Sequence, residues 1–325
     1  MKPKLLIIEL WGLGDLVIAT PFLRAAVEKF DVTLVAKPYA QELQPRFWPG
    51  VRVLPFTAPW TAFKRKYIVW RWPWRAIREH RAELLAQKFD LALSGRWDPR
   101  DHYILARSGA RRRIGFPRVG SGIFLTTRLG RPAPNAHRYE FWRVLAGELG
   151  LVLPPRDNAF AQKPSGENLP LLVHSGAAQP VRVWPLDRYF NLVKQLRAQG
   201  RRVTVACDAD QLDSWQRLGE TDAVAPKSVT ELLALLDRSS AFIGNDSGPG
   251  HLAAVCGLPT FSIFGPQLSE WFAPLQRHGV TIEGKPCPFK PCSDYCRFET
   301  AHCIRDISER EVAGEVAAFL KKNFP

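Results

Sequence analysis

The chain has 325 residues, of which 46% are hydrophobic and 23% charged; this suffices for about two folded domains and excludes a disordered chain. The 45 Lys and Arg outnumber the 31 Asp and Glu, giving a formal net charge of +14. No apolar run reaches the roughly 18 residues of a membrane-spanning helix. Because the opening segment resembles a strand more than a signal peptide, we expect a cytoplasmic protein.

The excess positive charge lies in the first half of the chain. Residues 1–150 hold 26 Lys and Arg and 12 Asp and Glu, whereas residues 151–325 hold 19 of each kind. Because a charged surface attracts ligands of opposite charge, the first half is expected to face an anionic partner. That partner is nucleic acid, a phosphorylated lipid or a membrane surface, unless the excess merely keeps the protein soluble.

Strands and helices alternate along the first half. Residues 5–10 form an apolar run that predicts a strand, and a Gly-rich turn follows before a helical stretch. Further elements are predicted in chain order: strands at 31–36, 89–93 and 113–116, a Pro-rich loop at 128–138 and a helix at 139–150. Residues 151–170, rich in Pro and without clear periodicity, are expected to link two domains.

The second half repeats the alternation. Strands are predicted at 170–174, 202–206, 241–244 and 260–264, and helices at 186–199, 230–239, 251–256 and 308–319. Thr230 is the expected N-cap of its helix, and Ser308 with Glu311 forms a capping box. This order of elements predicts two α/β domains, each built on a parallel sheet.

Gly12, Gly14 and Asp15 stand between the first strand and its helix. Glycines let the backbone approach a ligand closely, and the start of a helix favours an anion. Asp15 fits either a helix cap or a general base at the sheet edge where α/β folds bind ligands. The turn lacks the full glycine pattern of a dinucleotide fingerprint, which argues against a dehydrogenase.

Residues 245–251, Asn-Asp-Ser-Gly-Pro-Gly-His, form a second strand-to-helix turn. Free N–H groups at the helix start, together with the Ser247 hydroxyl, predict a cradle for a diphosphate. Asp246 is suited to hold a sugar hydroxyl, and His251 to donate a hydrogen bond to a leaving phosphate. The alternative is a helix cap beside a core histidine.

A third group of polar residues follows the strand at 170–174. Ser175 and Gly176 open its loop, and Arg182 is placed to neutralise a departing diphosphate without a metal. Asp208 and Asp210 have the spacing of a metal-bound nucleotide-sugar site, but acidic pairs after strands are common loop residues. A contact of either residue with a ribose hydroxyl is a further alternative.

Four cysteines, Cys287, Cys292, Cys296 and Cys303, lie in the spacing C-x4-C-x3-C-x6-C. Such a set can hold zinc or a cluster, although a C-x2-C pair is missing and a reduced structural loop is the favoured alternative. Disulfides are disfavoured in the cytoplasm. We therefore expect no catalytic metal and no cofactor.

Residues 59–75 interleave four Trp with Lys and Arg. Aromatic and cationic side chains together are typical of membrane-surface contacts and also of single-strand nucleic-acid binding. A basic loop with buried Trp is the alternative.

Three segments together resemble the ADP-heptose:lipopolysaccharide heptosyltransferases, glycosyltransferase family 9. They are GLGDLVIATPFLRA at 12–25, VHSGAAQPVRVWPLDRYFNLVKQL at 173–196 and GNDSGPGHLAAVCGLPTFSIFGP at 244–266. The resemblance implies a GT-B fold, two Rossmann-like parallel-sheet domains facing across a cleft. It also implies inverting, metal-independent transfer of a heptose from ADP-heptose to the inner core of lipopolysaccharide.

The resemblance implies the following domains and roles. Residues 1–152 form the acceptor-binding domain, residues 165–307 the nucleotide-sugar domain, and the terminal helix at 308–325 returns to the first domain. Asp15 matches the general base of the family, and domain closure brings it to the donor. Donor contacts are expected from Ser175, Gly176, Arg182, Asp210, Ser228, Asp246, Ser247, Gly248 and His251, and acceptor contacts from Gly12, Gly14, Lys64, Arg65, Arg96 and Arg113.

The expected partners are an ADP-sugar, an anionic lipopolysaccharide core and the inner face of the inner membrane, without nucleic acid. Arg182 stands where the family commonly has Lys, which keeps the charge but changes the geometry. The alternatives are a GT-B enzyme that uses another nucleotide sugar and, from a different class, a basic nucleic-acid-binding protein.

Overall fold

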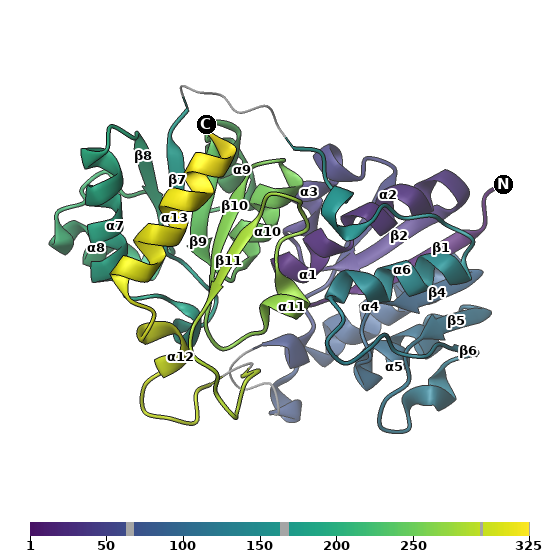
Figure 1. The fold of residues 1–325 in the computed structure, drawn as a ribbon. Coiled ribbons are helices and arrows are strands. Elements are labelled where there is room, and N and C mark those ends of the chain that lie inside the picture. The colour runs from purple at the N-terminus through teal and green to yellow at the C-terminus, as the bar shows by residue number, and fades with distance from the viewer. Residues whose placement is uncertain (63–67, 163–168, 293–294, 325) are drawn as a thin grey trace. The chain divides into compact units, whose positions relative to one another are not determined.

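The computed structural model describes residues 1–62, 68–162, 169–292 and 295–324. The chain divides into two compact units, Met1–Pro154 and Pro155–Pro325, close to the predicted division at 152 (Figure 1). Lys64 and Arg65, two of the expected acceptor contacts, lie outside the described residues.

The first unit is built on a six-stranded parallel sheet in the order β3-β2-β1-β4-β5-β6. Its strands are β1 (Lys4–Glu9), β2 (Asp31–Ala36), β3 (Val51–Pro55), β4 (Leu91–Ser94), β5 (Arg112–Gly115) and β6 (Thr127–Arg128). In this register Ile8 lies between Val35 of β2 and Ser94 of β4. The ends of β1 and β4 therefore place their loops side by side.

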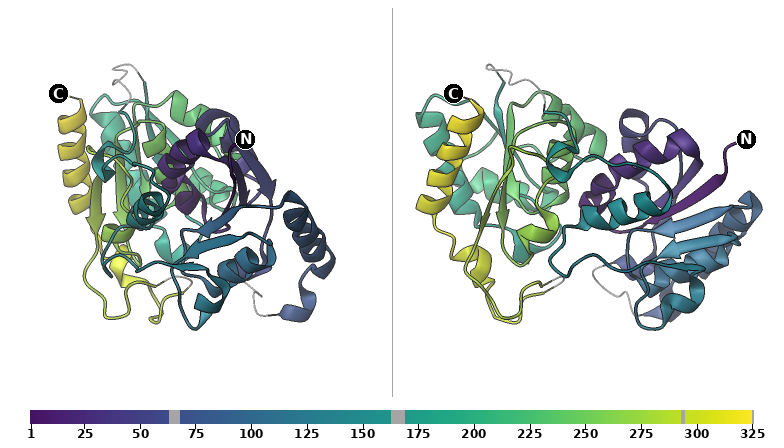
Figure 2. Two further views of the ribbon diagram at one scale, coloured as in Figure 1. Left: turned by 90° about the vertical axis from the view of Figure 1, so that its right-hand side faces the viewer. Right: turned by 45° about the vertical axis from the view of Figure 1, so that its right-hand side comes forward.

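Helices cover both faces of this sheet (Figures 1 and 2). The helices are α1 (Leu13–Ile18), α2 (Thr20–Lys29), α3 (Ala40–Phe47), α4 (Trp74–Gln87), α5 (Pro99–Arg107) and α6 (Arg138–Glu148). Short 3₁₀ turns are η1 (Pro59–Thr61), η2 (Val69–Arg71) and η3 (Ser121–Phe124). Leu6 and Ile8 of β1 share one core cluster with Leu84 of α4 and Leu105 of α5.

The second unit has a five-stranded parallel sheet in the order β11-β10-β9-β7-β8. Its strands are β7 (Leu171–His174), β8 (Val203–Ala206), β9 (Ala241–Asn245), β10 (Thr260–Phe264) and β11 (Val280–Glu283). The sequence did not reveal β3 or β11, because both are short and lie at a sheet edge, where burial is weaker and the apolar signal is diluted.

The helices of the second unit also lie on both faces of its sheet (Figures 1 and 2). They are α7 (Leu186–Ala198), α8 (Leu212–Leu218), α9 (Val229–Asp237), α10 (Gly248–Val255), α11 (Ser269–Phe272), α12 (His302–Arg305) and α13 (Glu309–Asn323). The 3₁₀ turns are η4 (Arg156–Asn158), η5 (Pro180–Arg182) and η6 (Ala209–Gln211). Helix α10 begins at Gly248, three residues before the prediction, so its first turn includes the glycines of the 245–251 segment.

The terminal helix α13 corrects one expectation. Its apolar residues Val312, Val316 and Phe319 are buried in the core of the second unit with strand and α7 side chains. The helix, yellow in Figure 1, therefore packs on the second unit instead of returning to the first domain. The capping box of Ser308 and Glu311 is confirmed, with Ser308 Oγ accepting the Glu311 N–H at 3.2 Å.

The Trp-rich segment divides into buried and exposed parts. Trp60 is buried and Trp72 packs against the same cluster, 5.6 Å between ring centroids. Trp70 is 80% exposed and Trp74 46% exposed. The segment is therefore neither wholly a surface for membrane or nucleic-acid contact nor wholly a basic loop with buried Trp, because two of its four Trp rings pack in the core. Among the described residues, no helix combines the length and apolarity that crossing a bilayer requires.

Candidate functional site

Asp15 occupies the first turn of α1, directly beyond the end of β1. One carboxylate oxygen, Oδ2, accepts the Gly12 N–H at 3.2 Å, and the other, Oδ1, accepts the Arg96 guanidinium at 2.6 Å. About a fifth of each side chain of this ion pair stays exposed. Asp15 is thus both a helix cap and an ion-paired carboxylate that solvent can reach, which suits proton transfer with a bound hydroxyl.

Arg96 comes from the loop after β4, which the sheet order places beside β1. Its guanidinium lies 4.7 Å from the centroid of the Trp11 ring, and that of Arg100 lies 5.7 Å from the same ring. The sequence predicted Arg96 as an acceptor contact. That assignment stays a prediction, and the described contact of Arg96 is its ion pair with Asp15.

Two buried carboxyl groups behind Asp15 were missed by the sequence analysis. Glu9 is 3% exposed at the end of β1 and accepts the Trp11 N–H at 3.3 Å. Burial, and next the charge of Asp15, raise the pKa of Glu9 to about 8. Burial raises the pKa of Asp101 to about 7, while Ser94 donates to its carboxylate at 3.1 Å. For Glu9, the sequence did offer a signal, because an acidic residue stands at the end of an apolar strand.

Arg138 completes this charge cluster, which we define as Glu9, Asp15, Arg96, Asp101 and Arg138. Burial, and next repulsion by Arg96, lower the pKa of Arg138 to about 9, while its guanidinium stacks 4.0 Å from the Trp97 ring centroid. The cluster concentrates opposite charges at the carboxyl edge of the sheet, where α/β folds bind ligands.

The raised pKa of Glu9 predicts a pH-dependent stability. The folded chain holds the Glu9 proton up to about pH 8, whereas the unfolded chain loses it near its usual value of 4.5. The folded state therefore binds more protons in this window, and stability falls as pH rises from about 4.5 to 8, by up to about 1.4 kcal/mol per pH unit.

Urea unfolding of the full chain at a series of pH values measures this effect. Between pH 4.5 and 8, the unfolding free energy of the Glu9→Gln variant should depend less on pH than that of the unmodified chain. The dependence that remains comes from Asp101. Parallel curves for the two proteins would contradict the assignment to Glu9.

The other predicted acceptor residues have modest roles in the structure. Gly12 supplies the N–H that binds Asp15, and Gly14 lies inside α1. Arg113 donates to the carbonyl groups of Phe124 at 2.8 Å and Ala110 at 2.9 Å. The guanidinium of Arg113 thus ties two loops of its own unit together.

The second unit gathers its polar residues where β7, β8 and β9 end. These strands are neighbours in the sheet, so their carboxyl ends lie at one edge. Buried Asn245 connects the loops: its amide donates to the Ser175 carbonyl at 2.7 Å, and its Oδ1 accepts from the Trp184 N–H and the Tyr189 hydroxyl. The sequence analysis did not assign this role to Asn245.

Ser175 and Gly176 shape the loop after β7. The Ser175 side chain is buried, accepts the Trp215 indole N–H at 2.9 Å and donates to Gln211 at 2.8 Å. A Cβ atom at position 176 would overlap the Asp208 carboxylate, so a larger residue there would require the Asp208 side chain to move. The Ser175 hydroxyl is thus engaged with side chains of its own unit.

Arg182 and Asp246 form an ion pair across the same edge. The guanidinium lies 3.4 Å from Asp246 Oδ2, with Arg182 26% exposed and Asp246 4% exposed. Ser247 is the N-cap residue of α10 and Gly248 its first residue, while His251 is buried in the same helix. The structure thus brings Arg182 to the turn at 245–251, as a diphosphate site requires.

A pocket of about 600 Å³ lies beside this edge, lined by the loops after β7 and β8 and by residues 299–305. Asp210 lines it, whereas Asp246, Ser247 and His251 do not.

Ser228 caps α9 by accepting the Glu231 N–H at 3.1 Å, the role predicted for Thr230. As the described residues stand, no three His, Cys, Asp or Glu side chains are grouped closely enough to hold a metal ion.

Comparison with known sequences finds similarity mainly in the second unit. The sequence model of glycosyltransferase family 9 (heptosyltransferase) matches residues 144–302. Lipopolysaccharide heptosyltransferase 3 of Escherichia coli K12 is 35% identical over 104 residues. That alignment covers 29% of this chain and 30% of the relative, so the chain spans less than a third of the curated relative that it matches.

Comparison with solved structures extends to both units. E. coli heptosyltransferase WaaC, solved with ADP, matches with a TM-score of 0.74 at 19% identity, over 98% of this chain and 99% of that one. E. coli ADP-heptose lipopolysaccharide heptosyltransferase II gives 0.73 at 18%, over 99% and 100%. These likenesses confirm the predicted GT-B class of two Rossmann-like domains. Residues 144–302 are thus similar to glycosyltransferase family 9, the heptosyltransferase family.

Proposed function

We propose that this chain transfers a heptose from ADP-heptose to the inner core of lipopolysaccharide, as an inverting and metal-independent glycosyltransferase. The family match supports the class of reaction. The observation that carries the proposal is the Asp15 carboxylate, held by Arg96 and the Gly12 N–H at the sheet edge and still open to solvent.

Asp15 is the general base in this proposal. A single displacement with inversion needs a base that removes the acceptor proton as the anomeric bond breaks. The ion pair with Arg96 fixes the direction of the carboxylate, and the lone pairs that neither Arg96 nor the Gly12 N–H uses are available to a hydroxyl. An acceptor that carries anionic groups fits the basic first half of the chain.

The donor diphosphate is bound by the second unit. The start of α10, with Ser247 and Gly248, offers backbone N–H groups, and Arg182 offers a guanidinium that already pairs with an acid there. As ADP leaves, its growing negative charge is stabilised by these fixed dipoles and by Arg182. Asp210, on the wall of the 600 Å³ pocket, is assigned to the ribose hydroxyls.

Nucleotide binding tests the donor assignment. Calorimetric titration of the full chain with ADP, UDP and GDP is expected to give the tightest binding for ADP. Transfer from ADP-heptose should not change on adding Mg²⁺ or Mn²⁺. A preference for UDP or GDP would instead favour a GT-B enzyme with another nucleotide sugar.

We also propose that the enzyme works in the cytoplasm at the inner face of the inner membrane, with Trp70 in contact with the lipid surface. The 80% exposed Trp70 lies on a basic segment with Arg71, a combination that favours the interface of an anionic bilayer. Trp70→Ala should reduce sedimentation with vesicles containing anionic lipid, whereas Tyr103→Ala, a change at a half-exposed aromatic on α5, should not.

Vesicle binding that is equal in both variants would remove Trp70 from the interface. The nucleic-acid alternative predicts salt-dependent binding of DNA or RNA by the basic half that exceeds binding of lipopolysaccharide. We expect the opposite order, because a nucleic-acid module has no need for the Arg182–Asp246 site of the second unit.

A further inference from the structure

We propose that Asn245 is a positioning residue for the donor diphosphate, because its side chain holds two segments of the donor site against the start of α10. The two segments are the loop at 175–178, after β7, and residues 182–184, which include Arg182. Asn245 is 0% exposed, so it acts through these segments and does not touch the donor itself. This role rests on the proposed function of the second unit.

The side-chain amide of Asn245 makes three hydrogen bonds. Its Nδ2 donates to the Ser175 carbonyl at 2.7 Å, while its Oδ1 accepts the Trp184 backbone N–H at 3.0 Å and the Tyr189 hydroxyl at 2.9 Å. The partners fix the orientation of the amide, because a carbonyl only accepts and a backbone N–H only donates. A single side chain thus joins the ends of β7 and β9 to the segment that leads into α7.

The hydrogen bond to Trp184 controls the backbone close to Arg182. Arg182 lies two residues before Trp184 and ends η5, and its guanidinium lies 3.4 Å from Asp246, the residue that follows Asn245. The segment is therefore attached to the turn after β9 at two points, through a backbone N–H and through a long side chain. Because an arginine side chain has many rotamers, the ion pair alone leaves its backbone free to shift, and the backbone attachment removes that freedom.

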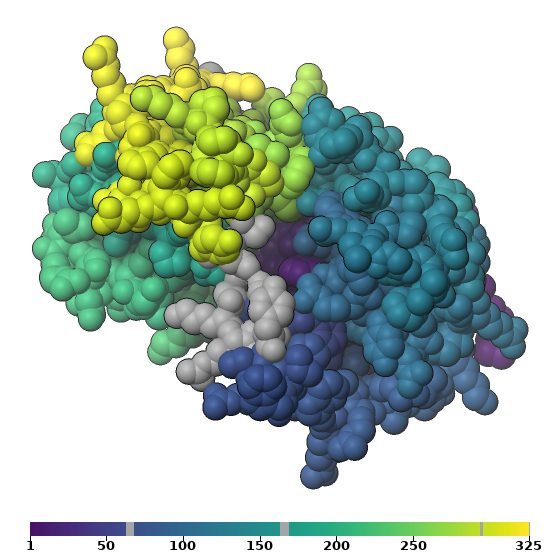
Figure 3. All heavy atoms as spheres, turned by 90° about the horizontal axis from the view of Figure 1, so that it is seen from below, coloured from purple at the N-terminus to yellow at the C-terminus, as the bar shows by residue number. Residues whose placement is uncertain are grey.

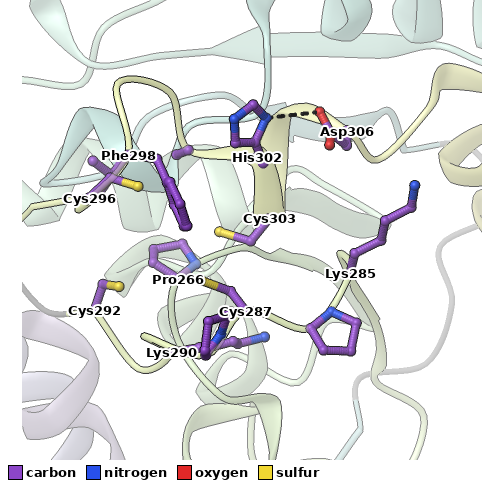
Figure 4. Close-up of a pocket in the computed structure, with 14 residues that line it drawn as sticks. Pro266, Lys285, Cys287, Lys290, Cys292, Cys296, Phe298, His302, Cys303 and Asp306 are labelled. Carbon is purple, nitrogen blue, oxygen red and sulfur yellow. Dashed lines mark ion pairs between the residues drawn. The ribbon is translucent and has the colours of Figure 1, made fainter.

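The turn η5, which carries Arg182, is weakly packed. All three of its residues remain at least partly exposed, and Val181 in the middle lines both the 600 Å³ pocket and a second cavity of about 260 Å³. Figure 4 shows the second cavity, whose walls include Pro266 and Cys303. The loop between β11 and α12 also lines it, and this loop is yellow-green to yellow on the surface in Figure 3. With two cavities beside it, η5 depends on hydrogen bonds such as that of Asn245 for its position.

The hydrogen bond to Ser175 acts on the loop after β7. Because a peptide group is planar, holding the Ser175 carbonyl also orients the Gly176 N–H, which donates to His174 Nδ1 at 3.1 Å. Burial lowers the pKa of His174 to about 4, so the ring is neutral and able to accept this bond. The peptide is thus held at both ends, and the chain continues to Ala177 on the wall of the 600 Å³ pocket.

Holding both segments before the nucleotide arrives should tighten its binding. Groups that are already ordered lose less conformational freedom when a ligand binds. Fixed dipoles also stabilise the charge that grows on the departing diphosphate without having to rearrange. Asn245 is therefore expected to affect both the affinity for a nucleoside diphosphate and the rate of transfer, and to leave binding of the acceptor unchanged.

Asn245→Leu tests the role, since leucine has a similar shape but makes no side-chain hydrogen bond. Calorimetry of the full chain is expected to show a Kd for ADP that is raised by about tenfold or more, the effect of losing a buried polar contact. The kcat for transfer should fall as well, while the KM for the acceptor should not change. This split separates positioning of the donor from a general loss of stability, which would affect both substrates alike.

Tyr189→Phe is the matched control. It removes one hydrogen bond from the same amide, but it keeps the ring whose centroid lies 5.0 Å from that of Trp184, and it leaves both segments attached. Its affinity for ADP and its transfer rate should equal those of the unmodified chain. Equal weakening in the two variants, or an unchanged affinity for ADP in Asn245→Leu, would overturn the role.

Hydrogen exchange in the unmodified chain gives a test that needs no variant. Without nucleotide, the backbone N–H groups of Gly176 and Trp184 should already exchange slowly, and ADP should slow them little further. Strong protection that appears only with ADP would mean that the ligand orders these segments, and it would overturn the role.

The choice of nucleotide separates this role from the proposed function. If UDP or GDP binds more tightly than ADP, the heptose assignment fails, but the same comparison of Asn245→Leu with Tyr189→Phe applies to that nucleotide, since the diphosphate is shared. If the unmodified chain binds none of the three, the proposed function and the role of Asn245 fail together.

Discussion

Replacing Asp15 by Asn is expected to lower kcat for heptosyl transfer by about 10²–10⁴-fold, the usual contribution of a general base. The amide is similar in shape and can still accept the Gly12 N–H, so α1 keeps its cap. It cannot take the acceptor proton. Steady-state transfer assays with ADP-heptose and a lipopolysaccharide core acceptor measure the loss.

The affinity for ADP should be unchanged in this variant, because the expected donor residues belong to the second unit. Asp31→Asn, at an exposed acid that begins β2, is the matched control and should transfer heptose at the normal rate. If Asp15→Asn turned over normally, the base would have to be another group of the first unit.

Replacing Arg96 by Met is expected to destabilise the chain by about 3 kcal/mol, the low end of the range for removing one partner of a buried ion pair. The low end applies because a fifth of the Arg96 and Asp15 side chains is exposed. Without the guanidinium, the Asp15 carboxylate loses its paired cation in a site that is largely shielded from water. Denaturant unfolding at pH 7 measures the change.

Adding Glu9→Gln to the Arg96→Met variant should change this loss little at pH 7, because Glu9 is already protonated there. Arg100→Met is the control. Arg100 also pairs with an acid and lies over the Trp11 ring, but it is 39% exposed, so its removal should cost less than about 1 kcal/mol. Equal losses for Arg96 and Arg100 would contradict a special role for Arg96.

Much of the candidate site follows from local sequence. A Gly-rich turn after an apolar strand predicts both the position of Asp15 and the ligand-binding edge, because parallel α/β units always place such turns at the carboxyl end. The same holds for residues 245–251, where Ser247 and Gly248 begin α10. Patterns of this kind extend over fewer than ten residues and need no knowledge of distant partners.

Contacts between residues far apart in the sequence could not be predicted in the same way. Arg96 is 81 residues from Asp15, and Asn245 is 70 residues from the Ser175 carbonyl that it binds. Only the order of strands in the sheet decides which loops become neighbours. For this reason Arg96 was expected to bind an acceptor, and the buried carboxyl of Glu9 was not recognised.

The terminal helix shows the same difference between features that local sequence predicts and features that depend on tertiary packing. Its capping box and apolar spacing could be predicted from the sequence, because they depend on residues three or four positions apart. Its docking on the core around α7 depends on which apolar surface the rest of the chain leaves uncovered. The sequence by itself predicted the alternating elements, the resemblance to a family and the position of the two turns after β1 and β9. Tertiary structure decided which charges meet and which surface each helix covers, because long-range packing energies are not encoded in any local pattern.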